Sequence, residues 1–278
     1  MKMKNKRVLH IAYTLTKGGA SKATLNIIES LKKRNISQYT FSLDDLIKKK
    51  FILFLKLIFI NLFFKSINKN KKSKVSFNYF NINYLKELEN RFDIIHIHWI
   101  GNEFLSLKEI LNIKKKIVWT IHDDWLNNYV SHIGPENNKF NIFSVFFKKR
   151  IINLKKKLFN KNINYVAPSN YILNNLKKKI HSKINYIQHP INEKIFFYKK
   201  NHQNKIRFNI GGSNVFNDKN KGSHLIDKLI DSIKKNFKEN EFELIFFGSK
   251  HYDDKYINNK NIKIKNFIKP KEISKIFN

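Results

Sequence analysis

The sequence contains no cysteine among its 278 residues. The chain therefore forms no disulfide bond and offers no thiolate to a metal ion. This excludes a disulfide-stapled secreted scaffold and a cysteine-based zinc site. A reducing compartment suits this composition, and the prediction is a cytoplasmic protein.

Apolar runs of membrane-spanning length are also missing. The run FILFLKLIFINLFF at residues 51–64 is interrupted by Lys56 and Asn61 and is shorter than a span, which needs about 20 residues. Its flanks are rich in lysine. Two interpretations remain open: a buried or inter-domain helix, which is favoured, and a basic helix lying on an anionic bilayer surface. The apolar stretch after MKMKNK is too short for a signal peptide and predicts a first buried strand, Arg7–Tyr13.

Acidic residues, glycine and proline are scarce. Asp and Glu number 21 against 55 Lys and Arg, a formal net charge of +34, with 8 Gly and 4 Pro. Such a charge is typical of proteins that bind nucleic acid or anionic membranes. The abundance of Lys, Asn, Ile and Phe instead favours codon drift in an AT-rich genome, and no helix-turn-helix, zinc-finger or RNP-type spacing is present. We therefore expect no nucleic-acid partner, and attraction to anionic lipid is the remaining alternative.

The stretch FDIIHIHWIGNEFLSLKEILNIKKKIVWTIHDDW, residues 92–125, organises the chain. It predicts two strands, Asp93–His98 and Ile117–Ile121, around an amphipathic helix. In a parallel sheet the carboxyl ends of the strands border the ligand crevice. Both strands end in titratable and aromatic residues, so one site would contain His96, His98, Trp99, His122, Asp123 and Trp125.

The segments HIHWI and VWTIHDDW closely resemble the N-terminal domain of family 4 glycosyltransferases, in particular the bacterial group that builds capsule, exopolysaccharide and lipopolysaccharide sugars. The resemblance implies the α/β GT-B fold, two Rossmann-like domains with parallel sheets that face each other across a cleft. It also implies a retaining hexosyltransferase-like enzyme. This enzyme would move a sugar from a nucleotide-sugar donor to a cell-surface polysaccharide or a lipid-linked acceptor, without a cofactor.

The same resemblance implies roles for individual residues. His122 would contact the transferred sugar and steady the transition state, and Asp123 would orient His122 or cap the next turn. His98 and Trp99 would shape the acceptor side. A metal site is the alternative, because His96 and His98 point to one strand face and would join His122. No Glu or Cys is spaced to complete that set, so the prediction is a site without metal.

The segment LHIAYTLTKGGAS places a glycine pair between the first strand and a helix. Either a tight turn explains the pair, or it lets backbone N–H groups approach a phosphate at the helix N-terminus. The segment is similar to the family's first loop, which contacts the donor diphosphate or the acceptor. Gly18, Gly19 and Ala20 are therefore expected binding residues. The buried side of the helix would comprise Ala20, Ala23, Leu25, Ile27, Ile28 and Leu31.

Further elements follow along the chain. Residues 74–91 predict a short strand and a helix, and Phe143–Phe159 predicts a basic helix. INYVAPSNYIL predicts a strand and a helix capped by Ser169 or Asn170. The loop LNNYVSHIGPENNKF departs from the family's Gly/Cys-rich segment. INYIQHPINEKIF resembles the family's inter-domain linker, which gives an acceptor-side domain at 1–190 and a partial nucleotide-sugar-binding domain at 191–278.

In the second domain, KIRFNIGGSNVFNDKNKGSH predicts a strand, a glycine turn and a helix opened by Lys221–Gly222. A lysine beside a helix N-terminus suits a nucleotide diphosphate. Relatives use the Lys of such a pair, so Lys221 is expected to bind the donor, with Lys219 in partial place of the family's arginine. Gly248 ends the strand FELIFFGSK and joins this expected donor site. In a chain so rich in lysine, chance placement is the alternative.

The sequence ends inside a predicted helix, before the E-x7-E element whose first glutamate faces the donor sugar in the family. The second domain is therefore expected to be truncated. Two hypotheses follow. The first is a glycosyltransferase with peripheral contact on the inner face of the plasma membrane. The second is an inactive remnant, or a partner-dependent non-catalytic subunit of the same fold.

Overall fold

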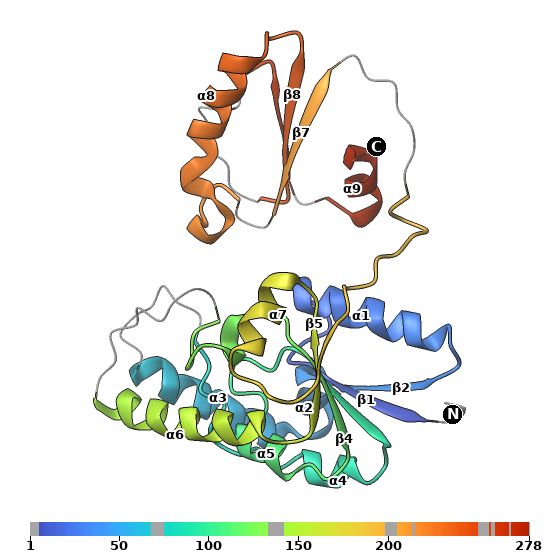
Figure 1. The fold of residues 1–278 in the computed structure, drawn as a ribbon, viewed down its shortest axis with the longest axis vertical. Coiled ribbons are helices and arrows are strands. Elements are labelled where there is room, and N and C mark those ends of the chain that lie inside the picture. Colours follow the sequence, from blue (N-terminus) through green and yellow to red (C-terminus); the bar gives the residue numbers. More distant parts are fainter. Residues whose placement is uncertain are drawn as a thin grey trace. The chain divides into compact units, whose positions relative to one another are not determined.

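The computed structural model describes residues 6–67, 75–132, 142–197, 205–212, 215–249, 256, 259–266 and 268–277. The chain divides into two compact units, Met1–Pro190 and Ile191–Asn278. Each unit is built around a parallel β-sheet with helices packed on it (Figure 1). The predicted α/β class with parallel sheets is therefore confirmed.

The first unit holds a six-stranded sheet in the order β2-β1-β3-β4-β5-β6. All neighbouring strands pair in parallel, and the order changes direction at β1, which lies between β2 and β3. Ligands of open α/β sheets bind at such a switch point, beyond the carboxyl ends of the strands. The bounds are β1 (Arg7–Ile11), β2 (Ser37–Phe41), β3 (Ile94–Ile97), β4 (Lys116–Thr120), β5 (Ile163–Ala167) and β6 (Ile184–Tyr186).

Helices cover both faces of this sheet, with α1 on one face and α5 and α6 on the other (Figure 1). Ser169 caps α7 as predicted, because its hydroxyl accepts a hydrogen bond from the N–H of Ile172 at 3.3 Å. The helices are α1 (Gly19–Lys32), α2 (Leu43–Lys49), α3 (Phe51–Ile67), α4 (Leu85–Glu89), α5 (Leu107–Asn112), α6 (Ile142–Phe159) and α7 (Asn170–Lys177), with a short 3₁₀ turn, η1 (Asp124–Leu126).

The helix predicted between the two central strands is confirmed as α5, which starts at Leu107 because the Ser106 hydroxyl accepts from the N–H of Glu109. Two other sequence expectations in this unit are wrong. The described part of 74–91 holds no strand before α4. The buried Glu103 carboxylate instead accepts N–H groups from that segment, at residues 77 and 78. On α1, Leu25 is exposed and Thr24 is buried in its place.

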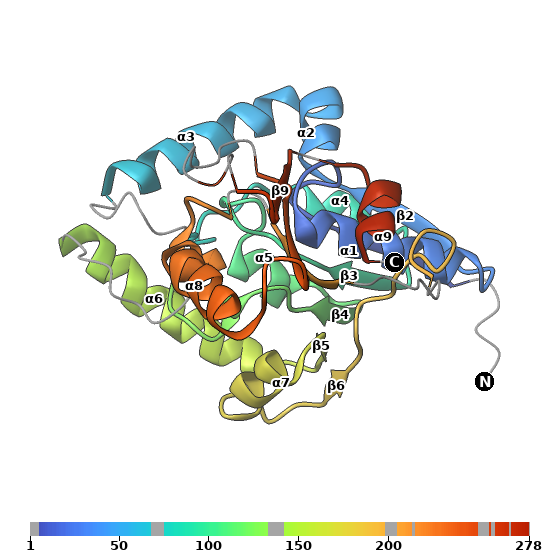
Figure 2. The same ribbon diagram turned by 90° about the horizontal axis from the view of Figure 1, so that it is seen from above.

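The apolar helix α3, which follows α2 directly along the chain (Figure 2), is only partly buried within the first unit. Leu57 and Phe64 belong to the core and Leu53, Phe54 and Ile60 pack against it, whereas Ile52 and Phe59 are 81% and 71% exposed. A helix that is apolar all round carries no stripe that says which face packs, so the sequence left this open. In the described part of the chain, no helix combines the length and apolarity needed to cross a membrane.

The second unit holds a three-stranded parallel sheet, β7 (Ile206–Gly211), β8 (Phe242–Phe247) and β9 (Ile262–Lys265). Figure 1 shows α8 (Ile226–Asn236) on one side of this sheet and α9 (Pro270–Phe277) on the other. Successive side chains of β8 point to opposite faces of the sheet. Leu244 and Phe246 pack with apolar residues of α8, and Ile245 and Phe247 pack with Ile276 of α9.

The helix expected to open at Lys221–Gly222 begins later, at Ile226. Two 3₁₀ turns, η2 (Lys219–Lys221) and η3 (Ser223–Leu225), precede it. Gly222 between them has φ +80°, a left-handed conformation that interrupts a right-handed helix. Lys221 therefore stands one turn before α8 rather than at its first residue.

Candidate functional site

A pocket of about 440 Å³ lies at the carboxyl ends of β1, β3 and β4, beside the N-terminus of α1. It brings together six of the residues singled out in the sequence, namely Gly18, Gly19, Ala20, Trp99, His122 and Asp123. Ala12, Tyr13, Thr14, Lys17, Ser21, Thr24 and Asn102 complete its lining. The expected binding residue His98 is fully buried behind this wall.

The loop that enters α1 is held by Ser21, whose hydroxyl lies within hydrogen-bond distance of the carbonyl oxygens of Thr14 and Lys17, at 2.7 and 2.6 Å. Gly18 is the N-cap of α1, with φ +92° and ψ 168°. Only glycine adopts this backbone conformation without strain. Because glycine has no side chain to accept from the first-turn N–H groups, these donors remain for a ligand. A methyl group at Gly19 would meet nothing within 4 Å.

Asp123 joins the ends of two strands. Its Oδ1 accepts from the N–H of Trp125 at 3.0 Å, which caps η1. Its Oδ2 accepts from the indole N–H of Trp99 and from Nδ1 of His132, both at 2.6 Å. Burial acts to raise the pKa of Asp123, but hydrogen bonds from His132 and its other donors outweigh it and lower the pKa. The structure shows the capping role and no hydrogen bond from Asp123 to His122.

His132 is a site neighbour that the sequence did not reveal. Its ring is 3% exposed and its Nε2 lies 2.8 Å from the hydroxyl of Ser76. It lies in the loop after Trp125, of which residues 133–141 fall outside the described part. A lone histidine in a polar loop carries no periodic signal, so only the folded chain identifies it as the partner of Asp123.

A row of histidines runs beneath the pocket. His10 pairs in register with His96 across β1 and β3. Nδ1 of His10 lies 3.0 Å from Nε2 of His98, and Nδ1 of His98 lies 3.4 Å from Nε2 of His122. The ring of His122 stacks on that of His189, 5.0 Å between centroids.

Burial keeps this row uncharged at neutral pH. It lowers the pKa of His10 and of His122 to about 4, and that of His96 and His98 well below the usual value. In a low-dielectric sheet interior the neutral imidazole is favoured over the cation. His122 therefore meets the pocket as a neutral ring with one lone pair.

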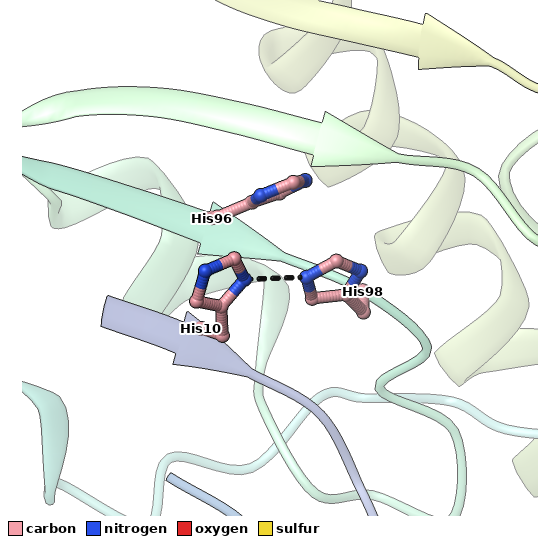
Figure 3. Close-up of side chains that lie close together, drawn as sticks. All are labelled: His10, His96 and His98. Carbon is pink, nitrogen blue, oxygen red and sulfur yellow. Dashed lines mark hydrogen bonds between the residues drawn. The ribbon is translucent and has the colours of Figure 1, made fainter. Parts of the chain in front are cut away.

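Within the described residues, the three side chains whose ligand atoms approach one another as a metal site requires are His10, His96 and His98, all within 4.8 Å (Figure 3). This differs from the set considered in the sequence, with His10 in place of His122. His96 Nε2 also lies 2.8 Å from the hydroxyl of Thr120. The facing nitrogens of His10 and His98 are hydrogen-bonded to each other, as the dashed line in Figure 3 marks.

The remaining expected donor residues belong to the second unit. Lys219 and Lys221 are exposed on η2. Gly248 follows β8 with φ +88°, and a methyl group there would lie 3.4 Å from the backbone of Gly212, which follows β7. The carboxyl ends of these two neighbouring strands thus approach closely through glycines.

A family model described as Glycosyltransferase Family 4 matches residues 17–194, which is more than half of the chain. The chain belongs to glycosyltransferase family 4. The matched range includes the pocket loop from Lys17, both ends of the β3–α5–β4 segment and His189. It confirms the family suggested by HIHWI and VWTIHDDW.

Solved structures with a similar fold also match. Two crystal structures of Anabaena Alr3699/HepE match, one in complex with UDP-glucose and one with UDP and glucose. They show 11% and 12% identity and TM-scores of 0.47 and 0.51, and cover 95% and 97% of this chain and 70% and 72% of that chain. At this identity the likeness to the complex with UDP and glucose supports the fold alone. No curated protein sequence matches significantly.

Proposed function

We propose that this family 4 glycosyltransferase transfers a sugar from a nucleotide-sugar donor with retention of anomeric configuration. The observation that carries the proposal is the neutral His122, which lines the same pocket as the glycine loop at the start of α1. UDP and glucose in the matching HepE structure support a nucleotide sugar as the donor class.

In the proposed step the bond between the anomeric carbon and the diphosphate oxygen breaks as the sugar becomes oxocarbenium-like. An acceptor hydroxyl bonds to the same face of that carbon, and its proton passes to the leaving diphosphate. His122, uncharged, accepts a hydrogen bond from a sugar hydroxyl and positions the ring. Asp123 holds Trp99 in the pocket wall and so fixes the surface on the acceptor side. The first-turn N–H groups of α1 bind an anionic group of a substrate. In the second unit, Lys219, Lys221 and the glycine turn at Gly248 bind the diphosphate, whose growing charge the lysines stabilise.

The test uses the purified chain with UDP-glucose first, then with GDP-, ADP- and CMP-sugars, and follows nucleotide release and the anomeric configuration of the product by NMR. We expect donor-dependent nucleotide release that falls at least about 100-fold in His122→Ala. His181→Ala, on the surface of the same unit, is the matched control and should be unaffected. Donor binding without any turnover would favour the non-catalytic subunit, and activity retained in His122→Ala would refute the site.

We further propose that the acceptor is presented at an anionic membrane, to which α3 docks. Seven apolar side chains of this helix are exposed: Phe51, Ile52, Leu55, Ile58, Phe59, Leu62 and Phe63. Lys56 and Lys65 are exposed on the same helix, and Lys48 and Lys49 precede it. Phe63 also contacts Phe147 of α6, whose Lys148 and Lys149 add positive charge. Apolar side chains flanked by lysine are typical of interfacial helices.

Vesicle co-sedimentation tests this attachment. We expect binding to vesicles that contain phosphatidylglycerol and much weaker binding to pure phosphatidylcholine. Replacing Ile52 and Phe59 by Asp should release the protein, whereas Leu25→Asp, on an exposed helix position of the same unit, should not. Phe54 is unsuitable because it packs against the core. Unchanged partitioning of the double variant would contradict the proposal.

A further inference from the structure

The side chain of Gln38, on β2, fixes the position of a proton on His10. The Gln38 amide nitrogen donates to the carbonyl oxygen of Ile36 at 2.9 Å, so its oxygen faces the other way. That oxygen lies 2.5 Å from Nε2 of His10. An amide oxygen only accepts hydrogen bonds, so Nε2 of His10 carries the proton. In the neutral ring Nδ1 of His10 then holds a lone pair.

The proton position on His10 fixes the proton positions on the next histidines of the row, His98 and His122. Because Nδ1 of His10 is an acceptor, the facing Nε2 of His98 must donate to it. Nδ1 of His98 then holds its lone pair toward Nε2 of His122, which must donate in turn. The last ring in the row is therefore left with its own lone pair on Nδ1. Among the described residues, no side chain forms a hydrogen bond with that atom.

We infer that Gln38 and His10 are positioning residues that set the tautomer of His122, through His98, so that its Nδ1 is a hydrogen-bond acceptor in the pocket wall. The inference rests on the proposed contact of His122 with the transferred sugar. It deepens that proposal, because the substrate group beside Nδ1 must be a donor such as a sugar hydroxyl. A substrate that offers only acceptors at this point would leave the lone pair unpaired in a buried wall.

A metal ion bound by His10 and His98 would give the opposite result. It would take the lone pairs of His10 Nδ1 and His98 Nε2, which leaves the proton of His98 on Nδ1. His98 would then donate to His122, whose Nδ1 would carry the proton. The hydrogen-bonded row and a metal site therefore predict different tautomers for the same ring, and one measurement separates them.

The test is the tautomer of His122 in the full chain, measured by histidine side-chain ¹⁵N NMR and assigned with His122→Ala. We expect a protonated Nε2 and an unprotonated Nδ1 in the native protein. Gln38→Met keeps the side-chain length and removes the acceptor, so His122 should become a mixture of both tautomers. Gln38→Glu keeps an acceptor toward His10 and should preserve the native tautomer. Tyr39→Phe, at the next position of β2, is the matched control.

Activity supplies the second measurement. With a donor that supports turnover, Gln38→Met should lower kcat about 10-fold with little change in KM, while Gln38→Glu should retain most of it. The NMR result stands by itself if no transfer is found, so failure of the proposed function does not hide it. A protonated Nδ1 in the native protein, stoichiometric metal in the purified chain, or an unchanged His122 tautomer in Gln38→Met would overturn the inference.

Discussion

The Oδ2 atom of Asp123 lies 2.6 Å from the indole nitrogen of Trp99, and this contact joins the loop after β3 to the loop after β4. The same oxygen accepts from His132. The carboxyl ends of the two central strands are thus tied by one carboxylate that also caps η1. The pocket wall depends on this group.

Replacing Asp123 by Ala should therefore lower the free energy of unfolding of the first unit. It removes the oxygens that accept from the indole of Trp99, from His132 and from the N–H of Trp125, at an expected loss of about 2–4 kcal/mol. Chemical denaturation measures the change. Glu29→Ala, at an exposed position of α1, is the control and should stay within about 0.5 kcal/mol of the parent. A loss as small as that of the control would show that the Asp123 contacts contribute little.

The glycine pair should separate strain from ligand binding. Gly18→Ala places a side chain at φ +92° and should lower stability by about 1–3 kcal/mol. Gly19→Ala meets no atom within 4 Å and should leave stability nearly unchanged, but its methyl group enters the pocket and should weaken ligand binding. Thermal unfolding and donor titration of the two variants are the measurements. Equal stability of both variants would contradict the strain at Gly18.

Lys155 should be a structural lysine of the site. Its side chain is buried, and its ammonium donates to the carbonyl oxygens of Trp125, Asn128 and Tyr129. Lys155→Met should cost about 2–4 kcal/mol, because these acceptors lose a charged donor. The neighbouring Lys156→Met, at an exposed position, should be close to neutral. Hydrogen exchange should show faster opening of the loop at residues 123–132 in the first variant, and equal exchange in both would refute this role.

The buried histidines should make the protein sensitive to mild acid. In the folded chain the pKa of His10 and of His122 is about 4, against about 6.5 when unfolded. The unfolded state therefore binds protons first, and the free energy of unfolding should fall as the pH drops from about 6.5 to about 4. Near pH 5.5 the slope is about 1.2 kcal/mol per pH unit for each histidine.

Urea denaturation between pH 7.5 and 4.5 measures this slope. In His122→Ala the slope at pH 5.5 should decrease by the contribution of about one proton, because the variant lacks one buried imidazole that stays neutral in the folded state. His181→Ala removes an exposed ring and should leave the slope unchanged. Identical slopes in the parent chain and His122→Ala would show that His122 takes up its proton equally in both states.

Local signals account for what could be predicted from sequence. Apolar β-branched runs predicted β1, β3 and β4 to within two residues at each end, because side-chain burial on both faces of a parallel sheet leaves that pattern. The N-cap residue Ser169 predicted the start of α7, because an N-cap is a hydrogen bond between residues close in the sequence. The capping box of Ser106 and Glu109 at the start of α5 is an equally local signal.

Contacts between segments far apart in the sequence account for the features that could not be predicted. Gln38 and His10 come from neighbouring strands, and His132 reaches Asp123 across a loop. The sequence determined the central strand–helix–strand segment, the residues at the carboxyl ends of its strands and the family. Tertiary structure alone decided which histidines are hydrogen-bonded to one another and which face of α3 is exposed. It also decided which side chains donate hydrogen bonds to Asp123. Hydrogen bonds and burial between distant segments depend on sheet register and packing, which no local pattern encodes.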